Sequence, residues 1–177
     1  MIRRSPLTLA VCLLAGCAGY RLTESRPTTL AVPGAPPAGL AKICVVRPQS
    51  RVLSYTAIVR DNGHLVGGTE GESFFCYLAA PGTHRMVTQT GRISEDATVY
   101  AEPAGVYALR QRVDYGLDNL RISQEWIDPA LAIEEARGLR ALTLAGAPAA
   151  EQLPRLGAVL PAAETTRSQA RVSGGAG

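Results

Sequence analysis

Two cysteines, two histidines and a pair of glutamates are the side chains in the middle of the chain that could carry chemistry. Cys44, Cys76, His64 and His84 are the residue types of a two-Cys, two-His zinc site. Compact sites of this kind place two ligands about two to four residues apart, and no pair here has that spacing. We therefore predict no metal site and no cofactor.

Catalysis by a cysteine nucleophile is the other chemistry to consider. Cys76 with His84 as its base, beside the carboxylates Glu70 and Glu72, would form a hydrolase or a metal-dependent enzyme. Such a thiol must be exposed and easily deprotonated, whereas alternation along residues 74–78 puts Cys76 on an apolar face. The glutamates lie in a glycine-rich turn, where solvated carboxylates are common. We predict a non-enzymatic protein, with this enzyme as the alternative.

The N-terminal residues have the three parts of an export signal: the basic pair Arg3–Arg4, an apolar run, and small residues before Cys17. The run is shorter than the roughly 20 residues of a membrane-spanning helix. The letters LLAGC, which end at Cys17, resemble the lipobox of bacterial lipoproteins, whose cysteine receives a diacylglycerol before the signal is removed. The resemblance implies a signal peptide over residues 1–16 and a lipidated Cys17. An ordinary secretory signal is the alternative.

A lipid anchor would attach the protein to a membrane leaflet, since each buried methylene group contributes about 0.8 kcal/mol. Ala18, and not an aspartate, follows Cys17. In the best-known sorting scheme this implies the outer membrane, at its periplasmic face or at the cell surface. The expected partners are therefore the membrane, through the anchor, and another envelope protein or a surface polymer.

Charge gives no reason to expect nucleic acid as a partner. The chain has 18 Lys and Arg and 15 Asp and Glu, and removal of residues 1–16 leaves a net charge of about +1. Nucleic-acid binding needs a clustered basic surface. The remaining basic clusters are small, so we exclude this class of partner.

The remaining cysteines carry information about the compartment. Cys12 leaves with the signal and Cys17 carries the lipid, so Cys44 and Cys76 are the two thiols left. In an oxidising envelope such a pair indicates one disulfide. The alternative is two small buried side chains on separate strands, because sequence spacing does not reveal the Cα separation that the bond needs.

The elements that position these residues lie in one domain, residues 41–144. Residues 17–40 are rich in proline and glycine and predict a flexible tether, and residues 145–177 predict a disordered tail. The domain is mainly β: we predict a single antiparallel β-sandwich with one C-terminal helix. Asp128 as N-cap and a proline at the first helical position predict this helix over residues 129–142.

The strongest hairpin signal is Asn62–Gly63, because a two-residue type I′ turn needs positive φ at both positions. It predicts that Asp61 faces His64 and that Val59 faces Val66. Further along the chain, Pro81–Gly82 predicts a turn after residues 73–80.

A last glycine turn, at Gly105, predicts a hairpin between residues 97–102 and 106–115. Strict alternation in residues 107–115 indicates a sheet with one face toward water. An exposed edge of such a sheet could also accept a strand from a partner.

This order of strands and turns is similar to the core of a bacterial lipoprotein domain family of unknown function. The resemblance is carried by the following positions: Asp61, Asn62 and Gly63, Gly67, residues 74–78, Pro81 and Gly82, His84, Gly105 and Tyr107. The pattern also resembles small β-sandwich modules with a P-E-G-A signature on bacterial surfaces, although that tetrapeptide is absent here. The resemblance implies a sandwich fold and carries no activity. We expect an envelope lipoprotein that acts as a binding or structural module, with a periplasmic enzyme as the alternative.

Overall fold

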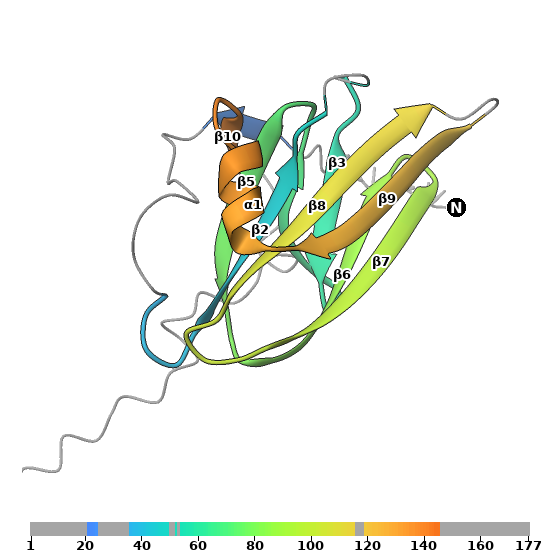
Figure 1. Cartoon of the computed structure of the whole chain (residues 1–177). Helices are drawn as coiled ribbons and strands as arrows, with labels where there is room; N and C mark the ends of the chain where they lie inside the picture. The colour runs from blue at the N-terminus through green and yellow to red at the C-terminus, as the bar shows by residue number, and fades with distance from the viewer. Residues whose placement is uncertain (1–20, 25–35, 50–51, 53, 116–118, 146–177) are drawn as a thin grey trace, which may run out of the picture.

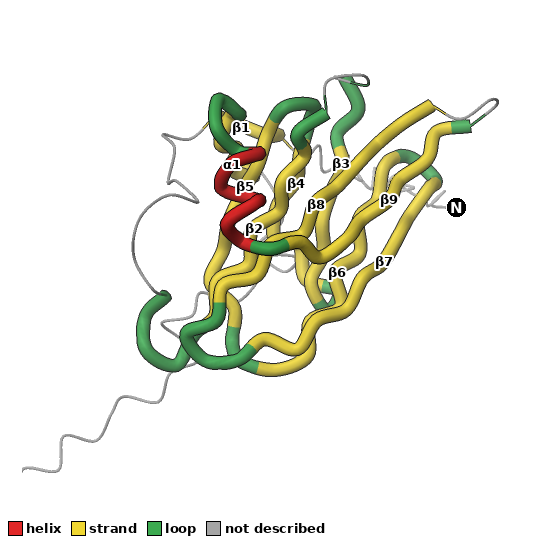
Figure 2. The backbone as a smooth tube through the Cα atoms, in the orientation of Figure 1, coloured by secondary structure: helices red, strands yellow, loops and turns green. Residues whose placement is uncertain are grey.

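The computed structural model describes residues 21–24, 36–49, 52, 54–115 and 119–145 (Figure 1). These residues form two β-sheets and one helix, which confirms the prediction of a mainly β sandwich (Figure 2). The predicted signal peptide, Cys17, much of the tether and the tail from residue 146 lie outside the described residues.

The larger sheet has six strands. Their order across the sheet is β1 (Arg21–Glu24), β10 (Arg140–Ala145), β5 (Ser73–Ala79), β2 (Ala41–Arg47), β8 (Val106–Tyr115) and β9 (Leu120–Ile127). The β2–β8 and β10–β5 pairs are parallel, and the other pairs are antiparallel. β2 is apolar along most of its length because both faces of this central strand are covered.

The smaller sheet has four antiparallel strands. Their order is β4 (His64–Thr69), β3 (Ala57–Asp61), β6 (Gly82–Thr90) and β7 (Ile93–Ala101). β3 and β6 bury every second residue, which is the period-2 pattern of a strand with one covered face.

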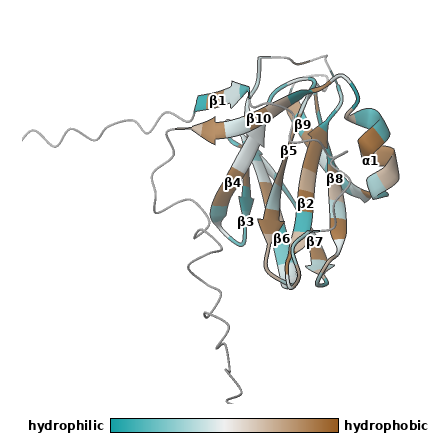
Figure 3. Cartoon of the chain, turned by 90° about the vertical axis from the view of Figure 1, so that its left-hand side faces the viewer, coloured by the Kyte–Doolittle hydropathy of each residue, from teal (hydrophilic) through white to brown (hydrophobic). Residues whose placement is uncertain are grey.

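The apolar core has two layers. Between the sheets, Ile43, Val45 and Leu109 of the larger sheet pack with Val59 and Met86 of the smaller one. On the other face of the larger sheet, helix α1 (Pro129–Glu135) covers β2, β5 and β8 with small alanine side chains (Figures 1 and 3). The helix therefore seals the only face of the strands β2 and β5 that the second sheet leaves uncovered.

The hairpin at Asn62–Gly63 has φ of 49° and 85° at these two residues, as a type I′ turn requires. Asp61 lies opposite His64, but Val59 lies opposite Gly67 and not Val66. The prediction for Val66 is wrong because the register shifts by one residue after Val59. Such a bulge leaves no mark in the alternation of residue types on which the prediction was based.

The predicted hairpin across Gly105 is also wrong. Gly105 does end a tight turn, in which its N–H donates to the carbonyl of Glu102 at 3.1 Å, but β7 and β8 belong to different sheets. The ring of Tyr107 lies where a Cβ on Gly105 would stand, so a larger residue would displace this ring, whose hydroxyl accepts a hydrogen bond from the Glu102 N–H at 2.8 Å. Pro81–Gly82 likewise leads from β5 in one sheet to β6 in the other. Both turns lead from one sheet to the other, although their residue types are the same as those of hairpin turns.

The elements near both ends of the domain differ from the predicted ones. Helix α1 ends at Glu135, and residues 140–145 form strand β10. Strand β1, which lies in the segment predicted to be a tether, pairs with β10 in the register Arg21 to Ala145. The ladder hydrogen bonds to β10 stabilise an extended segment that has too few apolar residues to predict a strand by itself.

Candidate functional site

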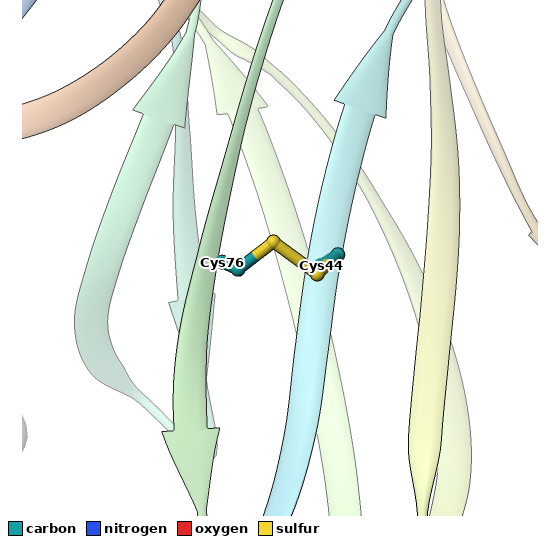
Figure 4. The surroundings of a disulfide bond; sticks show 2 residues. All are labelled: Cys44 and Cys76. Atoms are coloured by element: carbon teal, nitrogen blue, oxygen red, sulfur yellow. A yellow bond between two sulfur atoms is a disulfide. The ribbon is translucent and has the colours of Figure 1, made fainter. Parts of the chain in front are cut away.

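Cys44 and Cys76 form a disulfide between the neighbouring strands β2 and β5 (Figure 4). Their Cα atoms are 4.1 Å apart, and the two residues lie directly opposite each other in the antiparallel ladder. The bond faces the helix layer, where Phe74 and Ala132 pack beside it. Cys76 is therefore no free nucleophile in this structure.

Three polar side chains meet between the sheets. The Asp61 carboxylate oxygen Oδ2 lies 2.6 Å from His84 Nδ1 and accepts a hydrogen bond from the Tyr77 hydroxyl at 2.9 Å. Asp61 is 1 % and His84 7 % exposed. We call this the Asp61 cluster; it consists of Asp61, Tyr77 and His84. Sequence reasoning placed Asp61 opposite His64, which is its ladder neighbour, and missed the histidine that bonds to its side chain.

The Asp61 cluster is closed to a substrate by its own hydrogen bonds. His84 Nε2 lies 2.7 Å from the carbonyl oxygen of Ala80, so both ring nitrogens lie within hydrogen-bond distance of an oxygen of the protein. This arrangement holds β3, β5 and β6 together and engages both ring nitrogens inside the sandwich.

Burial and the neighbouring Asp61 carboxylate raise the pKa of the Tyr77 phenol from its ordinary value of 10.0. Above pH 10 the unfolded chain then releases this proton while the folded chain keeps it, so the stabilisation that is complete below pH 10 is lost as the pH rises. We expect the stability difference between the wild type and Tyr77→Phe to shrink by about 1.4 kcal/mol per pH unit above pH 10. Urea denaturation across this range measures it; a constant difference would contradict the raised pKa.

The glutamates of the alternative enzyme do not approach His84. Glu70 accepts from Thr56 Oγ1 at 3.4 Å and lies 3.6 Å from Arg140, while Glu72 is exposed in a turn with φ of 54°. Cys76 and Tyr77 point to opposite faces of β5, so the disulfide and the Asp61 cluster lie on different sides of the larger sheet. His64 is exposed beside its turn. Among the described residues, no three His, Cys, Asp or Glu side chains lie close enough together to hold a metal ion.

A second buried polar group ties the two sheets together. Thr69 donates to Gln111 at 2.7 Å, Gln111 donates to Thr88, and Thr88 donates to Gln124 at 2.8 Å. The four residues come from β4, β8, β6 and β9 and therefore alternate between the sheets. Buried polar groups of this kind must be paired, so this row fixes how one sheet lies on the other.

The end of the sandwich where β2 and β8 finish carries exposed aromatic side chains. Tyr55 is 39 % and Tyr115 64 % exposed; their rings are 6.0 Å apart in an edge-to-face arrangement, and Tyr115 donates a hydrogen bond to the Tyr55 hydroxyl at 2.9 Å. A shallow hollow of about 650 Å³ lies beside them, lined by Gln49, Val52, Asp114 and Tyr115. We call this region the tyrosine end.

Arg47 supports the tyrosine end from inside. Its guanidinium is fully buried and donates to the carbonyls of Tyr55 at 2.7 Å and Val52 at 2.6 Å. Burial lowers the pKa of Arg47, and the charges of Glu70 and Asp114 oppose this effect. Arg47 was not predicted to have a role, although it follows Ile43 and Val45 at alternate positions, which assigns it to their inward face.

Comparison with protein-family models, with curated proteins and with solved structures finds no match to this chain. The described residues also contain no helix that is long and apolar enough to span a bilayer.

Proposed function

We propose that the chain is an outer-membrane lipoprotein in which an acylated Cys17 anchors a non-catalytic β-sandwich that acts as a binding or structural module. The expected partners remain the membrane and an envelope protein or surface polymer. The similarity to lipoprotein domains of unknown function and to surface sandwich modules belongs to the same proposal.

The disulfide is the observation that carries this proposal. Cys44 and Cys76 lie opposite each other on neighbouring strands and are bonded, and structural disulfides are stable in the oxidising envelope but rare in the cytoplasm. This supports export, as does the signal pattern before Cys17.

The bonds made by the side chains that could take part in catalysis support a role without catalysis. The Cys76 thiol is consumed in the disulfide, and both nitrogens of His84 are bonded inside the sandwich. Glu70 lies near Arg140, apart from both. Cys76 and His84, the nucleophile and base of the alternative enzyme, therefore hold strands together.

We expect Cys17→Ser to move the protein from the membrane fraction to the soluble fraction of cells, because acyl chains attached at this thiol would be lost. Fractionation of cells and metabolic labelling with a radioactive fatty acid measure the change. Cys12→Ser, in the predicted signal peptide, is the matched control and should leave the label in place. An unchanged membrane fraction and label in Cys17→Ser would contradict the anchor.

A further inference from the structure

We propose that the sandwich is held with one defined end against the lipid headgroups. This end carries strands β1 and β10 together with Tyr55 and Tyr115. This inference rests on the proposed acylation of Cys17 and adds to it the surface that meets the membrane. The position of β1 supports this orientation, and so does the chemistry of the exposed side chains at the same end.

Strand β1 begins close to the anchor in sequence. Three residues separate Cys17 from Arg21, the first residue of β1. A fully extended chain covers at most about 3.6 Å per residue, so the Cα atom of Arg21 can stand no more than about 14 Å from that of Cys17. This bound holds for any conformation of the connecting residues. Because β1 is built into the larger sheet, the anchor holds the sheet itself and not a loose segment.

The ladder contacts fix which end of the sandwich this is. β1 pairs with β10, and Arg140 at the start of β10 lies beside Ser73, which in turn lies opposite Arg47 at the end of β2. Leu22 of β1 also approaches Gly68 of β4. Figures 1 and 3 both place β1 and β10 at one end of the molecule.

The opposite end lies about 20 Å away, which is the length of β5 from Ser73 to Ala79. It carries the Asn62–Gly63 hairpin and the loop of residues 102–105, whose Gly105 carbonyl accepts a hydrogen bond from the Lys42 N–H. With β1 at the membrane, these loops project away from the lipid, toward the space where a partner would be met.

The side chains of the membrane-facing end suit the headgroup layer. β2 and β8 run parallel, with Val46 beside Arg110, so Tyr115 lies beyond the point where β2 ends. The exposed rings of Tyr115 and Tyr55 are apolar with a polar hydroxyl, the type of side chain that accumulates at membrane interfaces. Three strand spacings, about 14 Å, separate β10 from β8. The start of β10 and the tyrosine pair therefore lie at the same end of the larger sheet.

The test compares fluorophores at the two ends of the full-length acylated protein. Thr143→Cys places the label on β10, and Glu102→Cys places it on the loop at the opposite end; both residues are exposed. The protein is reconstituted in vesicles of phosphatidylethanolamine and phosphatidylglycerol that contain a nitroxide-labelled headgroup lipid. We expect strong loss of fluorescence at Thr143 and no loss at Glu102. Equal quenching of the two labels, or stronger quenching at Glu102, would overturn the inference.

A matched variant isolates the short connection as the cause. A Gly-Ser insert of about 20 residues between Ala18 and Arg21 adds a reach of roughly 25 Å. It should abolish the quenching at Thr143 while the protein stays in the vesicle fraction; quenching that persists would also overturn the inference. If Cys17→Ser remains on the membrane, the proposed function is wrong. If the acylated protein binds the vesicles but the two labels are quenched equally, only the proposed orientation is wrong.

Discussion

Asp61→Ala is expected to lower the free energy of unfolding by about 2–5 kcal/mol, because two buried polar side chains lose the carboxylate that they share, at about 1–3 kcal/mol for each unsatisfied group. The carboxylate lies 2.6 Å from His84 Nδ1 and accepts from Tyr77 at 2.9 Å. Without it, His84 Nδ1 on β6 loses its partner, and the Tyr77 hydroxyl on β5 keeps only the weak acceptor Met86 Sδ at 3.3 Å. Urea denaturation at neutral pH, followed by the fluorescence of Trp126, measures the change. The urea concentration at the midpoint of the transition is expected to fall, while the slope of the free energy of unfolding against urea concentration changes little.

Two controls separate the buried pair from a general effect of removing a carboxylate. Asp61→Asn keeps the shape and one acceptor oxygen and should cost less than Asp61→Ala, since Tyr77 or His84 can still donate to it. Asp96→Ala removes an exposed carboxylate that pairs with Arg85 at 3.0 Å and should leave the stability close to that of the wild type. If Asp61→Ala were no more harmful than Asp96→Ala, the cluster would not stabilise the sandwich.

The sequence contained the information that places Asp61 and His84 inside, although their pairing was missed. Asp61 lies two residues after Val59, which was assigned to the inward face, and His84 alternates with the buried Met86. Alternation assigns a face to each residue within one strand. It does not say that β3 and β6 are neighbours, and this pairing is what brings the two side chains together.

The turn predicted from local residues agrees with the structure, whereas predictions that needed the register or the order of strands failed in part: Val59 lies opposite Gly67 and not Val66. The type I′ turn at Asn62–Gly63 is local, because it follows from residues that tolerate positive φ. The hairpin across Gly105 failed because a turn of the same composition can connect strands in two different sheets. β1 was missed since its pairing partner lies more than a hundred residues further along the chain.

Replacement of both disulfide cysteines, Cys44→Ala with Cys76→Ala, is expected to lower the free energy of unfolding by about 3–4 kcal/mol. The bond closes a loop with a sequence separation of 32 residues, and the chain-entropy model gives a loss of this size when such a loop is opened. β2 and β5 are neighbours in the folded sheet with or without the bond. The cross-link therefore acts mainly by restricting the unfolded chain.

Reduction of the wild type separates this effect from the loss of two sulfur atoms in the packing against α1. A reductant opens the loop but keeps both side chains, so the reduced wild type should lose most of the same stability, while the double variant should not respond to the reductant at all. The remaining difference between the reduced wild type and the variant measures the packing of sulfur against Phe74 and Ala132. Urea denaturation with and without dithiothreitol gives both quantities, with thiol titration to verify reduction. A reduced wild type as stable as the oxidised one would contradict this prediction and would mean that the sheet, and not the cross-link, determines stability.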